Sequence, residues 1–240
     1  MQPRPANLEA RAVGVLLRGE PEPLRAWLER AQARRLGFCV AVIFLGAGLY
    51  GAAMGWWRDP RQALYTALKF PLIILLTTTG NALLNAMLAP LLGLNLSLRQ
   101  SFLAILMSFT IASAILGSFS PLAAFVIWNT PPLSANAEVS GATYGLIQLA
   151  HVGVIAFAGV AANVRLVRLL RSLSGSAPAA WRVLAAWLAG NLFLGSQLCW
   201  LLRPFIGSPG LPVQFLRPTA FQGNFYEAVL GALRHLLHFN

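Results

Sequence analysis

The stretch LGFCVAVIFLGAGLYGAAMGWW, residues 36–57, decides the fold of this chain. It carries no charged side chain and is longer than the roughly 20 apolar residues that a helix needs to cross the hydrocarbon core of a bilayer. Four further stretches of the same kind occupy residues 70–92, 102–128, 142–164 and 183–202. The sequence therefore predicts an all-α, polytopic membrane helix bundle with about five transmembrane helices.

The overall composition supports this interpretation. Hydrophobic residues make up 57% of the chain and charged residues only 10%, against roughly 25% charged in a typical soluble domain. This balance excludes an ordinary water-soluble globule. The formal net charge of +11 would suggest nucleic acid in a soluble protein, but in a membrane protein basic residues mark cytoplasmic loops and lipid head-group contacts. We therefore expect the lipid bilayer as a partner, and no nucleic acid.

Two segments of different composition flank the predicted bundle of residues 36–202. Residues 1–35 intersperse leucines with arginines and predict an amphipathic leader at the cytoplasmic membrane surface, with a solvated helical leader as the alternative. Residues 203–222 contain four prolines and two glycines, so we expect an irregular loop there. Residues 223–239 then predict a second, interfacial amphipathic helix, which completes a C-terminal region of residues 203–240.

The distribution of basic residues predicts the orientation. With the N-terminus in the cytoplasm, twelve Lys and Arg residues fall on the inner side and six on the outer side, as the positive-inside rule favours. Arginine supplies every basic residue except Lys69, a bias that suggests a bacterial coding sequence. We therefore expect a bacterial inner-membrane protein with a cytoplasmic N-terminus and a periplasmic C-terminus.

The second predicted span contains the densest set of polar residues within the apolar stretches. Asn81 and Asn85 lie four residues apart and share a helix face, with Thr77 and Thr78 one turn earlier on the same side. These amides and hydroxyls could line a hydrated path. They could equally hydrogen-bond a neighbouring helix, as Thr and Asn do in membrane proteins. We favour helix packing, since the stripe contains no ionisable residue.

The fourth predicted span places Gln148 and His151 on one face. A membrane histidine can relay protons, ligate a metal or pigment, or hydrogen-bond within the bundle. We favour the structural interpretation, because no second histidine or carboxylate lies within the predicted membrane core.

The end of the fifth predicted span is the most distinctive part of the chain. Gly190 and Gly195 predict a close helix approach there. The irregular segment that follows must cover its own apolar residues, either by packing over the mouth of the bundle or by docking on another protein. The candidate residues for this capping or partner surface are Asn191, Gln197, Trp200, Arg203, Phe205, Arg217, Phe225 and Tyr226.

No pattern in the sequence indicates catalysis, a cofactor or a metal site. The chain contains no HExxH, GxSxG, P-loop or dinucleotide-binding motif, and none of its seven acids falls in a predicted span. Cys39 and Cys199 lie within predicted spans and are expected to be small buried residues, with no disulfide between them. We therefore expect a protein that is not an enzyme and has no cofactor.

Two resemblances to known proteins rest on short motifs. The run GSQLCWLLRPFIGSP at residues 195–209, followed by GNFYE at residues 223–227, resembles a signature of bacterial multi-pass membrane proteins that have no assigned activity. The leader, the five spans and the pattern LRQSF at residues 98–102, with Pro121 beyond it, show a weaker similarity to Yip-type membrane proteins. The resemblance covers mainly residues 60–200 and implies a non-enzymatic, partner-binding protein, without assigning a role to any residue.

These observations predict a non-catalytic integral membrane protein that acts as a subunit or scaffold of a membrane complex, with a protein partner or as a homo-oligomer. The alternative is an oligomeric channel or transporter with a polar, uncharged path.

Overall fold

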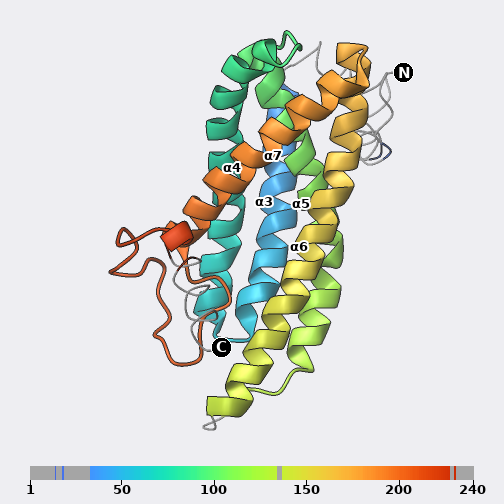
Figure 1. Ribbon diagram of the computed structural model, residues 1–240. Helices are drawn as coiled ribbons and strands as arrows, with labels where there is room; N and C mark the ends of the chain where they lie inside the picture. The colour runs from blue at the N-terminus through green and yellow to red at the C-terminus, as the bar shows by residue number, and fades with distance from the viewer. Residues whose placement is uncertain (1–13, 15–17, 19–32, 134–136, 228–229, 231–240) are drawn as a thin grey trace, which may run out of the picture.

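The computed structural model describes residues 14, 18, 33–133, 137–227 and 230 of this chain. Within them, five helices follow one another: α3 (Ala33–Trp56), α4 (Pro60–Leu91), α5 (Leu98–Trp128), α6 (Ala137–Ser174) and α7 (Ala177–Leu202) (Figure 1). All five are long and apolar enough to cross a membrane, and the described residues include no β-strand. The predicted all-α fold with five transmembrane helices is thereby confirmed, and the chain is a multi-pass membrane protein.

Capping side chains explain where three of the helices begin. The carboxylate of Asp59 accepts a hydrogen bond from the backbone N–H of Arg61 at the start of α4, at 2.7 Å. Ser97 and Gln100 form a reciprocal capping box at the start of α5. Ser176 accepts a hydrogen bond from the backbone N–H of Ala179 at the start of α7. Each cap satisfies a backbone donor that has no partner within its own helix.

The second predicted span begins earlier than the sequence suggested. The predicted span begins at residue 70, but α4 runs without interruption from Pro60 to Leu91 and contains Pro71. A proline inside a helix removes one backbone hydrogen bond. The helix continues because α4 is packed against both α3 and α7, and tertiary packing outweighs the local cost.

The connection between α6 and α7 is also tighter than the sequence suggested. The predicted spans end at residue 164 and begin again at residue 183, but in the structure only Gly175 and Ser176 separate the two helices. Gly175 adopts a positive φ of 62°, the conformation in which a glycine commonly ends a helix. Because Ser176 then caps α7 at once, the chain reverses direction within one turn.

Helix α3 lies in contact with both α4 and α5, and its glycines bring the backbones close together. A Cβ atom added at Gly51 would lie 2.7 Å from the carbonyl oxygen of Thr66, and one added at Gly55 would lie 2.6 Å from that of Gln62. On the α5 side, a Cβ atom added at Gly117 would lie 2.9 Å from the Cα of Gly46. Small residues thus allow three helices to meet at backbone distance, as membrane bundles require.

Helix α7 runs obliquely across the other helices (Figure 1). It contacts α6 and α4, and in Figure 1 it leaves α6 at the top of the view and reaches α4 near mid-height. Helices α6 and α7 are the least enclosed of the five, whereas α5 is the most enclosed. The outer face of α6 exposes a series of apolar side chains to the surroundings: Leu146, Leu149, Val152, Phe157 and Val160.

The segment after α7, residues 203–227, folds back along α4, and we call it the strap (Figure 1). It is irregular through residue 224, two residues beyond the loop predicted over residues 203–222, and residues 225–227 are helical. The backbone N–H of Glu227 donates to the side chain of Asn224 at 3.0 Å, the arrangement of a capped helix start. Most of the predicted leader and the greater part of the predicted C-terminal amphipathic helix lie outside the described residues.

The contact between α3 and α4 gives a first prediction. Gly55→Ala is expected to lower the stability of the bundle by about 1–3 kcal/mol, because the added methyl group meets the backbone of Gln62 and Ala63. Thermal unfolding of both proteins in the same mild detergent measures the change. Gly153→Ala is the matched control, since a Cβ atom at that helical position meets open space. Equal Tm values for the two variants would contradict this account of the contact.

Candidate functional site

Asn81 of α4 faces α7 and is hydrogen-bonded to it. The Asn81 side-chain amide donates to the backbone oxygen of Trp187 at 3.0 Å and to the side-chain oxygen of Asn191 at 2.6 Å. Asn85 donates to the side-chain oxygen of Asn81. Gly190 makes room for this contact, because a Cβ atom there would collide with the Asn81 side chain. The cluster therefore joins α4 to α7.

The hydroxyl groups nearby divide into two kinds. Thr78 is fully buried and donates to the backbone oxygen of Ile74 in its own helix, at 2.7 Å. Thr77 is buried as well, but its hydroxyl finds no partner among the described residues, and neither does the side-chain oxygen of Asn85. Gly195 is the second glycine that the sequence suggested for close approach. A Cβ atom added there would lie 3.8 Å from the Thr77 hydroxyl oxygen, which is an ordinary van der Waals contact. Two buried oxygens at this interface thus keep unused hydrogen-bonding capacity.

His151 is paired with a tyrosine of the central helix. The Tyr50 hydroxyl lies 2.8 Å from Nδ1 of His151, and the two rings meet edge to face at 5.3 Å. Tyr50 is fully buried and His151 nearly so. Neither Gln148 nor His151 shares a cavity with the Asn81 cluster, so the two polar sets that the sequence suggested occupy different places. Within the described residues, no group of three or more His, Cys, Asp or Glu residues could hold a metal ion.

A third polar set, which the sequence analysis did not single out, holds the strap against α4. Gln62 donates to the backbone oxygens of Pro204 and Phe205 at 3.0 and 2.8 Å. Thr66 donates to the same Phe205 oxygen at 2.6 Å, and Lys69 donates to that of Pro204 at 3.0 Å. All three donors are fully buried. Their spacing of four and three residues on one helix face was a signal that the sequence contained.

Lys69 also lies among aromatic rings. Its ammonium group is 5.0 Å from the centre of the Phe215 ring and 6.0 Å from that of Phe205, within reach of a cation–π attraction. Lys69 directly precedes the predicted span of residues 70–92 and was counted with the basic residues of the outer side. The structure instead places it within α4, where it is fully buried and holds the strap.

Arg203 closes the junction between α7 and the strap. Its guanidinium lies 3.6 Å from the centre of the Trp200 ring and donates to the backbone oxygens of Trp200 and Thr219, at 2.5 and 3.4 Å. Desolvation and then the positive charge of Arg217 lower the pKa of Arg203 below its ordinary value. Trp200 in turn donates to the backbone oxygen of Gln222 at 3.4 Å.

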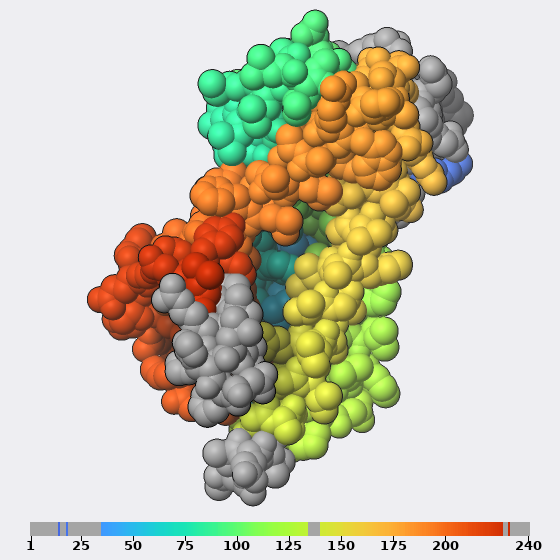
Figure 2. Space-filling model, viewed as in Figure 1, coloured from blue at the N-terminus to red at the C-terminus, as the bar shows by residue number. Residues whose placement is uncertain are grey.

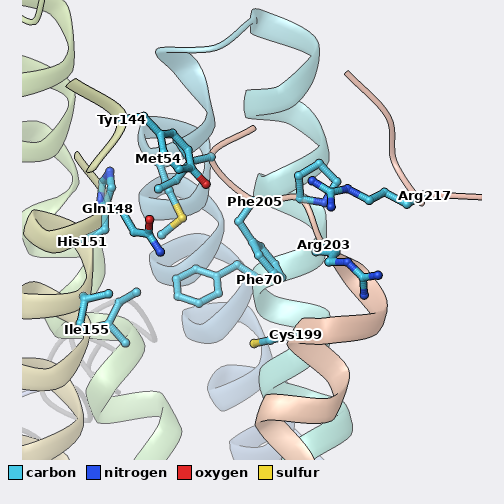
Figure 3. Close-up of a pocket in the computed structure, with 13 residues that line it drawn as sticks. Met54, Phe70, Tyr144, Gln148, His151, Ile155, Cys199, Arg203, Phe205 and Arg217 are labelled. Carbon is cyan, nitrogen blue, oxygen red and sulfur yellow. The ribbon is translucent and has the colours of Figure 1, made fainter. Parts of the chain in front are cut away.

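A cavity opens between α6 and the strap (Figure 3). Its volume is about 340 Å³, inside the range of roughly 300–1,000 Å³ that is typical of small-ligand sites. Met54 of α3 and Phe70 of α4 line it from within, and α6 contributes a row of residues from Tyr144 to Ile155 that includes Gln148 and His151. Cys199, Arg203, Phe205 and Arg217 complete the lining from α7 and the strap.

One of the two cysteines differs from the expectation. Both thiols are free, and Cys39 is buried as predicted, but Cys199 is exposed and lines the cavity. The difference arises because α7 leans away from α6 at this level and leaves Cys199 at the edge of the opening.

The outward side of the strap is apolar. Phe193 of α7 stacks on Tyr226 at 5.8 Å between ring centres, and the Tyr226 hydroxyl lies 3.0 Å from that of Ser196. Phe225 packs edge to face against Tyr226, while Gln197 is partly buried within α7. The strap nonetheless leaves large apolar side chains exposed: Leu211, Phe215, Leu216, Phe221, Phe225 and Tyr226.

Comparison of the chain with protein-family models, with curated proteins and with solved structures found no match. The resemblances drawn from short motifs stay predictions, and the site is interpreted from its own geometry.

The hydrogen bonds from α4 give a prediction about the strap. Gln62→Leu combined with Thr66→Val removes three of its anchoring bonds, so we expect the strap to open about ten times more often. The opening is measured with Ile206→Cys in a background in which Cys39 and Cys199 are replaced. Because Ile206 is only 7% exposed, a maleimide reaches the new thiol only when the strap opens, and the labelling rate follows the frequency of opening.

Thr78→Val is the matched control for this experiment, since its hydroxyl bonds only its own helix. Labelling that is equally slow in the double variant and in this control would contradict the anchoring role.

Proposed function

We propose that this protein is a non-catalytic subunit or scaffold of a membrane complex, and that the strap carries its partner surface. The observation that supports the proposal is the combination of a fixed backbone and an exposed apolar side. Buried donors of α4 hold the strap at Pro204 and Phe205, while Leu216 and Phe221 stay exposed on it. A fixed, aromatic-rich surface loses little conformational entropy on binding, which favours its use as an interface.

The distribution of Lys and Arg residues supports a proposal for the membrane in which the protein lies and for its orientation there. We propose a bacterial inner-membrane protein with a cytoplasmic N-terminus, so that the strap lies at the periplasmic side and contacts a second protein or a second copy of the chain. The basic residues at the end of α6 (Arg165, Arg168 and Arg171) and at the start of α7 (Arg182) then lie on the cytoplasmic side, in agreement with the positive-inside rule.

This proposal predicts an assembly that depends on the strap. Purified in mild detergent, the 25.9 kDa chain is expected to run as a complex of higher protein mass, and Phe221→Ala is expected to release most of it as the single chain. Leu146→Ala is the matched control, because Leu146 is 70% exposed on α6 and Phe221 is 79% exposed on the strap. Light scattering coupled to size exclusion gives the protein mass. A wild-type protein that is already a single chain would refute the proposal.

Point substitutions test this surface better than deletion of residues 203–240. The strap supplies the carbonyl oxygens that Gln62, Thr66 and Lys69 bind, so its removal takes away the acceptor of the buried Lys69 ammonium group and leaves Gln62 and Thr66 only the hydrogen bonds that they make within α4. Such a deletion would damage the bundle itself.

The alternative of an oligomeric channel or transporter is favoured by one observation, the unpartnered oxygens of Thr77 and Asn85 between α4 and α7. Polar oxygens of this kind can replace part of the hydration shell of a permeant species. This alternative predicts solute flux into reconstituted vesicles that falls at least tenfold in Asn81→Leu and persists in Thr79→Val, whose exposed hydroxyl bonds only its own helix. Absence of flux from the wild-type protein would eliminate it.

A further inference from the structure

Three cations gather where the strap meets the cavity. Arg217 lies within electrostatic reach of both Lys69 and Arg203, and Arg203 and Arg217 both line the cavity. In the part of the chain that the structure describes, these cations form no ion pair. The two carboxylates nearest in sequence, Asp59 and Glu227, cap helices instead. The group therefore carries an excess of positive charge beside apolar walls.

Arg217 is the cation whose hydrogen-bonding capacity is unused. Lys69 donates to the backbone oxygen of Pro204, and Arg203 donates to those of Trp200 and Thr219. The guanidinium of Arg217, by contrast, makes no hydrogen bond to any described residue. Figure 3 shows its side chain extending from the strap toward Phe205, at the rim of the cavity. Its donor groups are thus available to a ligand.

The cavity is open on the side that faces the membrane. Figure 2 shows the surface hollowed between α6 and the α7–strap side, with atoms of the inner helices visible at the base. The walls below the cations are mostly apolar, with Met54, Phe70, Val152 and Ile155 among them. Val152 is itself exposed on α6, so this wall continues into the lipid-facing surface. This wall offers an apolar surface to a hydrocarbon chain.

We propose that this cavity binds an anionic phospholipid, with the head-group phosphate on Arg217 and an acyl chain between α6 and α7. A guanidinium presents paired N–H donors that match the geometry of a phosphate, and Arg203, which also lines the cavity, adds a second positive charge there. The apolar walls exclude a small soluble anion as the best match, because they would remain unfilled. Basic pockets between transmembrane helices are suited to lipid head groups for the same reason. This inference does not depend on the scaffold role of the strap.

The test uses the full chain in a neutral detergent and native mass spectrometry with three probes: phosphatidylglycerol, phosphatidylcholine and inorganic phosphate. The wild-type protein is expected to retain phosphatidylglycerol and to bind it at least tenfold more tightly than phosphatidylcholine. Arg217→Gln is expected to abolish that preference. Arg61→Gln is the matched control, since Arg61 is exposed at the same end of the bundle and does not line the cavity.

A second pair of variants tests the acyl-chain wall and does not depend on how Arg217→Gln folds. Val152→Trp is expected to fill the opening and lower phosphatidylglycerol binding about tenfold, whereas Val160→Trp, on the same helix outside the cavity, is expected to leave it unchanged. Equal binding of both phospholipids would overturn the proposal, because it indicates only a surrounding lipid shell. Binding of inorganic phosphate as tight as that of phosphatidylglycerol would overturn it in favour of a soluble anion.

Discussion

Directly after α7, the chain places the backbone oxygens of Pro204 and Phe205 against α4, a helix that crosses the membrane. Little water is available there to bind them. An irregular segment is stable in such a place only if the protein supplies its hydrogen bonds. Gln62, Thr66 and Lys69 do so from one face of α4. The course of the strap, the position of Arg203 and Arg217 and the outer wall of the cavity all depend on this attachment.

The close packing on the other side of α4 makes the attachment possible. Gly51 and Gly55 allow α3 to approach the backbone of α4 around Gln62 and Thr66, which fixes the first turns of α4 in place. The donors that bind the strap therefore project from a rigid part of the helix. The glycines of α3 that contact the α4 backbone and the buried donors of α4 that bind the strap together set the architecture of this end of the molecule.

The cavity forms because α7 contacts different helices at its two ends. It meets α6 at one end and α4 at the other, and the Asn81–Asn191 hydrogen bond holds it to α4. Because α6 does not follow it, a gap forms that the strap closes only in part. The Tyr50–His151 pair lies at the inner side of this gap and connects the wall of α6 to the central helix.

The sequence alone was sufficient to predict the five helices, because a long apolar stretch in a bilayer has few alternatives to forming a helix. It also indicated that Asn81 and Asn85 share a face and that Gly190 permits close approach. It did not reveal which helix receives that face, nor the burial of Lys69, because both depend on tertiary contacts more than 100 residues apart along the chain. The continuity of α4 through Pro71 was missed for a related reason: local rules placed a break where packing prevents one.

The two-residue turn at Gly175 and Ser176 makes α7 a lever with its pivot beside α6. With a rise of about 1.5 Å per residue, its 26 residues form an arm of about 39 Å, so each degree of rotation at the turn moves the far end by about 0.7 Å. The far end is where Arg203 begins the strap. The hydrogen bonds from α4 therefore hold the chain at the end of α7 that a small rotation about Gly175 and Ser176 would displace most.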